Sequence, residues 1–393
     1  MDSLKKINID SLLWTGYSGM FFFLPVATSP TVICGVFVLG VWILSGKFLR
    51  DIRTWRNSKT KLPIIILMTL PWVGLIYTPL PEYGLPIALK TYYWFYAIAI
   101  APVLTIQRQP DRIIKMFLAG LSLNSAISII QFAGIVPLKK GLTTGLLGGS
   151  SAHITYSLLL VTGILIASFY FLKAQTKKEH LLYIFLMLQY FITIAFTEGR
   201  SGYIAFIVLS PLVVYNIIGQ KHVIKILIFS IVAISLLFAS PVVRSRLLKI
   251  ESDILLYKQG NVNTSIGLRF HIWEIALSEI KKNPIFGIGT AGFRRSWEVY
   301  KKDPSLGFYD HPHNSFLYMM VSFGISGLAA FCWLLIVMLK KGWQGRNSDL
   351  GFAVFAFTIV FTIGSLTNTQ VLPFATAVAF PLFAGMSEAI NVH

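Results

Sequence analysis

The sequence predicts an all-α membrane protein with many spans, and three observations carry this prediction. Of its 393 residues, 55% are hydrophobic and only 13% are charged, and the mean hydropathy is +0.69. Apolar runs near the roughly 20 residues that cross a bilayer recur along the chain. Runs of this length exclude barrel strands, which leaves helices as the structure that satisfies the backbone in lipid. We expect about twelve transmembrane helices, near residues 12–28, 30–46, 62–79, 88–107, 112–136, 152–172, 181–197, 201–218, 222–239, 315–339, 349–366 and 369–386.

The distribution of basic residues predicts the orientation of these helices. With the N-terminus inside, 19 of the 34 Lys and Arg residues fall in cytoplasmic segments, and three fall in short outer connections. Because Lys and Arg in short loops set the topology, both termini are expected in the cytoplasm. The net charge of +18 then reflects topology and contact with anionic membrane lipids, and it does not indicate binding of nucleic acid.

The predicted organisation is one membrane domain with a single large insertion. Residues 1–239 would form transmembrane helices 1–9, and residues 240–312 an outer, periplasmic loop domain. Residues 313–393 would form helices 10–12 and a cytoplasmic C-terminus. Cys34 and Cys332 both fall within predicted spans, so neither suggests a disulfide, a metal site or a redox motif.

The loop domain itself contains two predicted helices. The first covers about residues 243–258, and the second about residues 267–282, where Thr264 or Ser265 can cap its start. After the stop at Pro284 come closely spaced glycines. They resemble a dinucleotide-binding fingerprint, but no strand precedes them. We therefore expect a tight turn in which backbones pack closely.

Arg200 is the first candidate for chemistry. It lies in a short outward-facing hairpin between two predicted spans, flanked by Gly199, Ser201 and Gly202. Charges at the membrane boundary are costly and often functional, and the small neighbours would leave room for a ligand. The alternative is a structural arginine that reaches the surface or pairs with Glu198.

Arg269 is the second candidate, and it lies one helical turn before Trp273 on the apolar stripe of its predicted helix. Its planar fork of donors suits phosphate oxygens. The alternative is a structural salt bridge. No carboxylate lies three or four residues away, so such a partner would come from elsewhere in the loop.

His313 is the third candidate, at the junction between the polar loop and the apolar run that starts at Ser315. An imidazole there can act as a general base near neutral pH, and Asn314 could fix its orientation. The alternatives are a structural interfacial histidine, or His311 in the same role. Gly324 lies on the following helix with Gly327, where the pair would allow a close helix neighbour.

Several common catalytic motifs do not occur. The chain has no Asp-x-Asp pair, no P-loop, no His-Glu-x-x-His and no Gly-x-Ser-x-Gly sequence. ATP use and metal-dependent hydrolysis therefore have no support, and we expect neither a cofactor nor a metal site.

These candidates resemble the motifs of the O-antigen ligase family of multi-pass glycosyltransferases. The family's signature is a histidine, then Asn, Ser or Gln, nine residues, Gly, two residues, and a small residue or Tyr. The family also has an arginine in a Gly-Arg-Ser-Gly-like turn, and another on a loop helix with Trp a turn later. The resemblance covers about residues 190–330. The histidine signature matches His313, Asn314, Gly324 and Gly327. The two arginine motifs match Arg200 within residues 199–202, and Arg269 with Trp273.

The resemblance implies transfer of a glycan from undecaprenyl diphosphate to lipid A–core, in lipopolysaccharide biosynthesis. The reaction would take place at the periplasmic side of a Gram-negative inner membrane, in a GT-C-like architecture without metal or ATP. In-line attack on the anomeric carbon would invert it. The implied roles are a catalytic base for His313, diphosphate binding for Arg200 and Arg269, and support from Asn314, Trp273, Gly324 and Gly327.

Three alternatives remain open from the sequence. An O-antigen polymerase uses the same donor, and a protein O-oligosaccharyltransferase shares the histidine region but modifies a protein. The full histidine signature favours the ligase, as does the lack of a large soluble domain after residue 386. A transporter would use the arginines as an anion site, but transporters more often show inverted repeats and charges buried within their spans.

Overall fold

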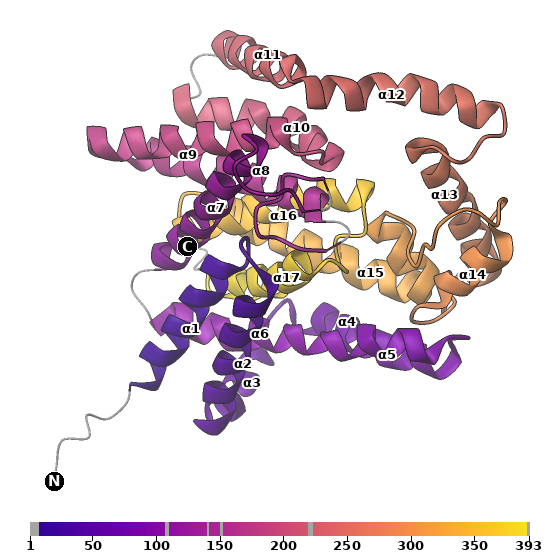
Figure 1. Ribbon diagram of the computed structural model, residues 1–393. Helices are drawn as coiled ribbons and strands as arrows, with labels where there is room; N and C mark the ends of the chain where they lie inside the picture. Colours follow the sequence, from indigo (N-terminus) through magenta and orange to yellow (C-terminus); the bar gives the residue numbers. More distant parts are fainter. Residues whose placement is uncertain (1–7, 107–109, 140, 150–151, 219–222, 391–393) are drawn as a thin grey trace.

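The protein is built of helices (Figure 1). The computed structural model describes residues 8–106, 110–139, 141–149, 152–218 and 223–390, and these residues form no strand. The first helices are α1 (Ile9–Phe23), α2 (Thr28–Leu44), α3 (Lys47–Trp55), α4 (Lys61–Tyr77), α5 (Pro81–Leu89), the 3₁₀ helix η1 (Lys90–Tyr93), α6 (Trp94–Ile106), α7 (Asp111–Phe132), α8 (Ala152–Lys173), α9 (Lys177–Phe196) and α10 (Arg200–Ile218). The others are α11 (Val223–Ala239), α12 (Pro241–Lys258), α13 (Ser265–Lys282), α14 (Gly292–Tyr300), α15 (Ser315–Gln344), α16 (Asp349–Thr367) and α17 (Phe374–Glu388).

The described helices include seven that are long and apolar enough to cross a membrane. The number rises to nine if two bent pairs, α2 with α3 and α11 with α12, each count as one span. Every one of the twelve predicted stretches contains a helix, but α1, α4 and α17 have only 15, 17 and 15 residues. These lengths fall short of the roughly 20 residues that a bilayer requires. The chain is therefore a multi-pass helical membrane protein, and the predicted number of twelve spans is not confirmed.

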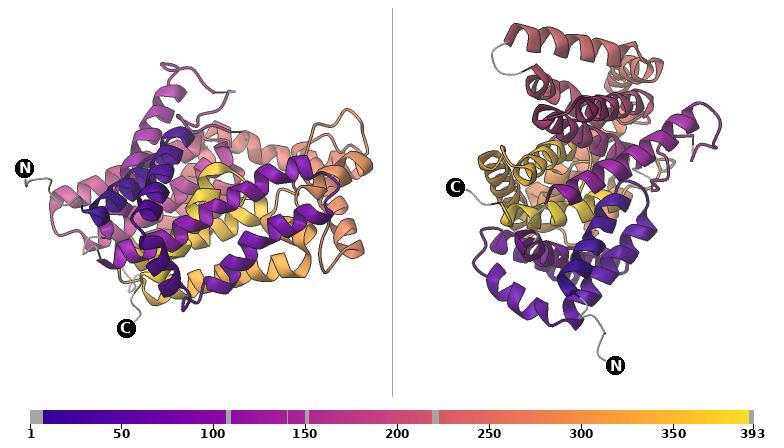
Figure 2. Two further views of the ribbon diagram at one scale, coloured as in Figure 1. Left: turned by 90° about the horizontal axis from the view of Figure 1, so that it is seen from below. Right: turned by 90° about the vertical axis from the view of Figure 1, so that its left-hand side faces the viewer.

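Helix α8 lies at the centre of the bundle. Almost all of its side chains are buried, as expected for a helix that is apolar on every face. It packs against α9, α10 and α16. The N-terminal helices and the α11–α12 pair lie on opposite sides of this centre (Figure 2, right). The core arrangement therefore holds the starts of α8 and α10 and the end of α16 in fixed positions.

The predicted loop domain contains the two helices that the sequence indicated. Helix α12 turns away from α11 by 86°, and α13 begins where the side chain of Thr264 accepts a hydrogen bond from the Gly267 amide at 3.0 Å. Helices α13 and α14 share a small core around the fully buried Trp297. That core includes Val321 of α15, so α13 and α14 are joined to the start of α15 at one end of the molecule (Figure 1).

The glycine-rich turn after α13 packs by its backbone, as the sequence predicted. The amides of Ile288 and Gly289 donate to the carbonyl oxygens of Val321 and Ser322 on α15, at 2.9 and 3.0 Å. On the other side of the turn, the hydroxyl of Thr290 donates to the carbonyl of Pro71 in α4 at 2.6 Å. The turn thus joins α4 to α15, because glycines let both backbones come close.

The predicted role of Gly324 and Gly327 was wrong. Gly324 has φ 63° and ψ −155°, which breaks α15 into two helical parts. Its Cα faces the backbone of Ile285, so among the described residues the glycine-rich turn, and not a neighbouring helix, lies closest to the missing side chain. Gly327 faces Met319 and Phe323 of its own helix. Both glycines therefore allow the break in α15, and the break frees the carbonyls that the turn binds.

Candidate functional site

The predicted base His313 lies in a short turn that leads into α15. Its φ of 48° is in the left-handed region, which non-glycine residues adopt at a cost of about 1–3 kcal/mol. Contacts on both sides hold this turn. The carbonyl of Pro312 accepts a hydrogen bond from the Trp273 indole at 2.9 Å, and the Asn314 amide donates to the Thr369 hydroxyl at 3.1 Å. The His313 ring is therefore presented by a strained but firmly anchored backbone.

The side chain that orients His313 is Asn368. Nδ1 of His313 lies 2.8 Å from Oδ1 of Asn368, which is fully buried after the end of α16. With Nδ1 donating its proton, Nε2 is the basic atom. Asn314, which was expected to orient the ring, instead caps α15 by accepting bonds from the amides of Phe316 and Leu317. That prediction was wrong because an asparagine one residue before a helix satisfies its free amides.

The electrostatic surroundings keep His313 neutral. Burial lowers its pKa to about 3, with further lowering from His311 and Arg269, while the bond to Asn368 acts in the opposite direction. The imidazole is therefore ready to accept a proton throughout the physiological range. It is nevertheless a weaker base than the sequence suggested, until a negative charge arrives nearby.

His311 supports His313 and is poorly placed to replace it. Nδ1 of His311 accepts the backbone amide of His313 at 3.3 Å, and the two rings are 4.5 Å apart between centroids. Burial lowers the pKa of His311, and the neighbouring Asp310 raises it. With Nδ1 occupied, Nε2 carries the proton and points toward Asp310, at 3.7 Å from Oδ1.

The two predicted arginines lie close together. Nη1 of Arg200, the first residue of α10, donates to the hydroxyl of Ser265 at 3.3 Å. Ser265 opens α13, one turn before Arg269 on the same side of that helix. Burial lowers the pKa of the half-buried Arg269, and the charge of Arg200 lowers it further. Two cations that repel each other in this way form a natural anion site.

Neither arginine forms an ion pair with a carboxylate within the described parts of the chain. Glu198, the expected alternative partner of Arg200, pairs with Arg246 of α12. No partner for Arg269 comes from elsewhere in the loop domain as described. The structural salt bridges that the sequence left open are therefore not formed. An anion approaching the start of α10 would also meet the free amides of a helix N-terminus.

The small residues around Arg200 do not leave space for a ligand, contrary to the sequence-based expectation. Gly199 and Gly202 both face Ser157 of α8, which fills the space beside them. Ser201 is buried and accepts a hydrogen bond from Thr367 at 2.6 Å. These residues instead bring α10 against α8 and α16. The consequence is that Arg200 and the Asn368 turn are held near each other.

Trp273 connects the helix that carries Arg269 to the turn that carries His313. Its helix, α13, carries Arg269, and its indole binds the His313 turn through Pro312. Arg269 is near enough for its charge to lower the pKa of His313. The structure thus brings Arg200, Arg269 and His313 together from three separate elements.

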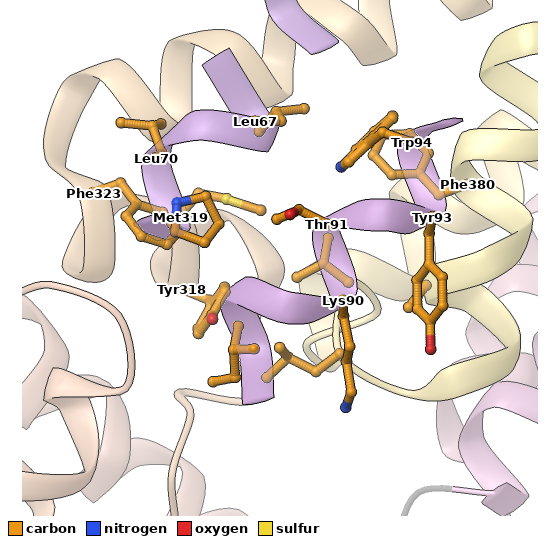
Figure 3. A pocket seen from close by; sticks show the side chains of 15 residues that line it. Leu67, Leu70, Lys90, Thr91, Tyr93, Trp94, Tyr318, Met319, Phe323 and Phe380 are labelled. Carbon is orange, nitrogen blue, oxygen red and sulfur yellow. The ribbon is translucent and has the colours of Figure 1, made fainter. Parts of the chain in front are cut away.

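One cavity borders the site at His311, and a second cavity shares Lys90 with it. The first has a volume of about 500 Å³ and is lined by Lys90, Thr155, Asp310, His311 and Phe374, among others. The second, of about 90 Å³, is lined mostly by apolar side chains, among them Leu67, Leu70, Trp94, Met319, Phe323 and Phe380 (Figure 3). Lys90 borders both, and its amine points away from the apolar side chains (Figure 3).

Sequence reasoning missed Asn368 as a site residue. It lies 55 positions after His313 and belongs to none of the matched motifs. The available signal was a run of four polar residues, 367–370, between the last two apolar stretches. Such a run at the end of a span indicates buried polar groups that need partners.

Comparison with known proteins finds similarity over part of the chain. Residues 182–332 match the family model described as O-antigen ligase. A provisionally named polysaccharide ligase of Rickettsia conorii is 26% identical over 206 residues, covering 50% of this chain and 48% of that protein. One of Rickettsia felis is 24% identical over 209 residues, with the same coverage. An uncharacterized protein of Haemophilus influenzae is 29% identical over 194 residues, covering 46% of this chain and 47% of its own length.

The alignments span about half the length of these relatives. The matched segment of this chain, however, contains all seven residues that the sequence singled out, from Arg200 to Gly327. Residues 182–332 are therefore similar to the O-antigen ligase family over the segment that carries the site.

Proposed function

We propose that this protein is an inverting, metal-independent O-antigen ligase. It would transfer a glycan from undecaprenyl diphosphate to lipid A–core in lipopolysaccharide biosynthesis. The observation that carries this proposal is the juxtaposition of two arginines that pair with none of the described carboxylates and a neutral, anchored histidine. The match of the same segment to the O-antigen ligase family model supports the glycan and lipid-linked substrates.

The proposed reaction is a displacement at the anomeric carbon of the donor. The acceptor hydroxyl loses its proton to Nε2 of His313 as its oxygen bonds to that carbon. The bond from carbon to the diphosphate oxygen breaks, and undecaprenyl diphosphate leaves with the electron pair. Arg200 and Arg269 stabilise the negative charge that develops on the leaving group, a role that metal-dependent enzymes give to a divalent ion.

The proposed setting is the inner membrane of a Gram-negative cell, with the site on the periplasmic side. Both termini would be cytoplasmic, residues 240–312 periplasmic, and the helical architecture GT-C-like. The asymmetric distribution of Lys and Arg supports this orientation. The division into residues 1–239, 240–312 and 313–393 is part of the same proposal.

Kinetics of arginine variants test the assignment of the diphosphate. Lysine should replace Arg200 or Arg269 poorly, because a point charge loses the bidentate contact. Loss of one charge-assisted contact should cost roughly 1.5–3 kcal/mol, about ten- to a hundredfold in rate. The measurement is transfer by purified protein, with Arg295→Lys, an exposed arginine of α14, as the control. Transfer at the wild-type rate by Arg200→Ala and Arg269→Ala would assign both residues to structure.

A competition between acceptors separates the ligase from its sibling transferases. Purified protein would receive the same lipid-linked glycan with lipid A–core, with a second lipid-linked glycan, or with a carrier protein. The ligase uses the first acceptor, a polymerase the second and a protein O-oligosaccharyltransferase the third. In cells, deletion of the gene should remove the glycan from lipid A–core while lipid-linked polymer accumulates.

A further inference from the structure

The cavity beside His311 has no role in the reaction described so far. Its volume of about 500 Å³ lies within the range of roughly 300–1,000 Å³ for small-molecule sites. Neither Arg200 nor Arg269 lines it. It is bounded by the start of α8, by η1, by the turn that carries His311 and by the start of α17.

The lining of this cavity contains polar groups without protein partners. The hydroxyl of Thr155 has no hydrogen-bond partner among the described residues, although Thr155 is only 2% exposed. Lys90 is exposed and forms no ion pair with any described residue, so its amine is free to bind a ligand; it points away from the apolar cavity behind it (Figure 3). A buried polar atom without a partner is unfavourable unless water or a ligand satisfies it.

The remaining lining residues add a carboxylate, an imidazole and an aromatic ring to the cavity. Asp310 offers carboxylate oxygens at the rim, and Nε2 of His311 points toward that carboxylate. Phe374 adds an aromatic ring to the lining. Hydroxyl groups need both donors and acceptors, and the apolar face of a sugar ring packs on aromatic side chains. The donors, acceptors and ring found here suit a saccharide.

The position of the cavity indicates which of the two substrates would bind there, the acceptor or the donor. In an inverting displacement, the nucleophile and the leaving group occupy opposite sides of the reacting carbon. The leaving diphosphate is assigned to Arg200 and Arg269, and the base His313 must lie beside the nucleophile. His311 lines the cavity, and its ring lies edge-on against the ring of His313. The cavity adjoins the neighbour of the base and is lined by neither arginine, which suits the acceptor better than the donor diphosphate.

We propose that this cavity is the subsite for the acceptor saccharide, recognised by Lys90, Thr155 and Asp310. The inference rests on the proposed transferase function and adds the location of the second substrate. The ammonium of Lys90 would favour an acceptor sugar that carries a negative group near the reacting hydroxyl, and Thr155 would bind one of its oxygens.

Photo-crosslinking tests which substrate occupies the cavity. p-Benzoylphenylalanine would replace Phe374 in the cavity, Ser265 at the arginines, or Leu248 as an exposed control on α12. In membranes that make lipid A–core but no lipid-linked glycan, the probe at position 374 should capture lipid A–core. The probe at position 265 should capture only the lipid-linked glycan when that is supplied. Capture of the lipid-linked glycan at position 374, or of neither molecule, would overturn the proposal.

Kinetics of the wild type and variants give a second, independent measurement. Lys90→Met and Thr155→Val should each raise the KM for the acceptor about tenfold, with the donor KM changed less than twofold. Lys258→Met removes the same charge at an exposed position of α12 and should change neither. A rise in donor KM alone would move the cavity to the donor.

The two proposals fail in different ways. If the wild type transfers only to a second glycan or to a protein, the ligase assignment is wrong. The effects of Lys90→Met and Thr155→Val on the acceptor KM and on the donor KM, measured with that acceptor, then still decide the role of the cavity.

Discussion

At the scale of single residues, the state of His313 depends on the charges around it. Burial, His311 and Arg269 together lower its pKa to about 3, so the folded protein holds the ring neutral between pH 5 and 8. The transfer rate should therefore show no fall near the ordinary imidazole pKa of about 6.5 as the pH decreases from 8 to 5. A profile of kcat/KM for the donor across this range, which reports the pKa values of the free enzyme, checks this expectation.

Binding of an anion at the arginines should change the same pKa. A diphosphate beside Arg269 offsets the charge that lowers the pKa of His313, so the pKa should rise. Titration of the histidine signals by NMR, with and without undecaprenyl diphosphate, measures the change. Arg269→Gln should raise the pKa in the absence of any ligand, whereas Arg246→Gln removes a charge already paired with Glu198 and should have little effect. An unchanged titration of His313 on adding diphosphate would argue against the shared site.

Asn368 is a positioning residue for His313, because it acts through the ring of that residue. Asn368→Ala leaves Nδ1 of His313 without its buried partner, at a cost of about 1–3 kcal/mol, and should lower kcat more than it changes either KM. Asn368→Asp places a carboxylate there and should raise the pKa of His313. A purely structural role would lower the thermal stability of both variants without moving the pH profile of Asn368→Asp.

At the scale of secondary-structure elements, the break in α15 determines where the histidine turn lies. Gly324→Ala would force a side chain into a backbone with φ 63° and against the backbone of Ile285. We expect a loss of at least about 1–3 kcal/mol of stability, seen as a lower midpoint of thermal unfolding in detergent. Gly40→Ala is the matched control, since nothing lies within 4 Å of the position its side chain would take. Equal midpoints for the two variants would contradict this account of the break.

Local signals predicted the elements better than they predicted the contacts between them. The apolar runs indicated the helices, and Thr264 caps α13 as its position before the helix suggested. The partner of Gly324 lies 39 positions earlier in the chain, and the partner of His313 lies 55 positions later. Periodicity and spacing describe one element at a time. They were therefore enough to identify Arg200, Arg269 and His313 as candidates, because each lies within a motif of its own element. They could not reveal Asn368, or that Ser157 fills the space beside Gly199.

At the scale of the whole molecule, the account requires the site and the two termini to lie on opposite sides of the membrane. Single cysteines at positions 260 and 344, in a background where Cys34 and Cys332 are replaced, should react oppositely with an impermeant thiol reagent. Position 260 should react in intact cells with a permeable outer membrane, and position 344 only after lysis. Labelling of both positions from the same side would contradict the topology and the proposed mechanism.

The central claim is that His313 acts as the base while Arg200 and Arg269 bind the donor. The most direct measurement is donor binding and single-turnover transfer by His313→Ala, side by side with the wild type and across pH. We predict that the variant binds lipid-linked donor as the wild type does and loses about 10²–10⁴-fold in transfer, the usual contribution of a general base. Loss of donor binding together with transfer, or transfer at the wild-type rate, would contradict the claim.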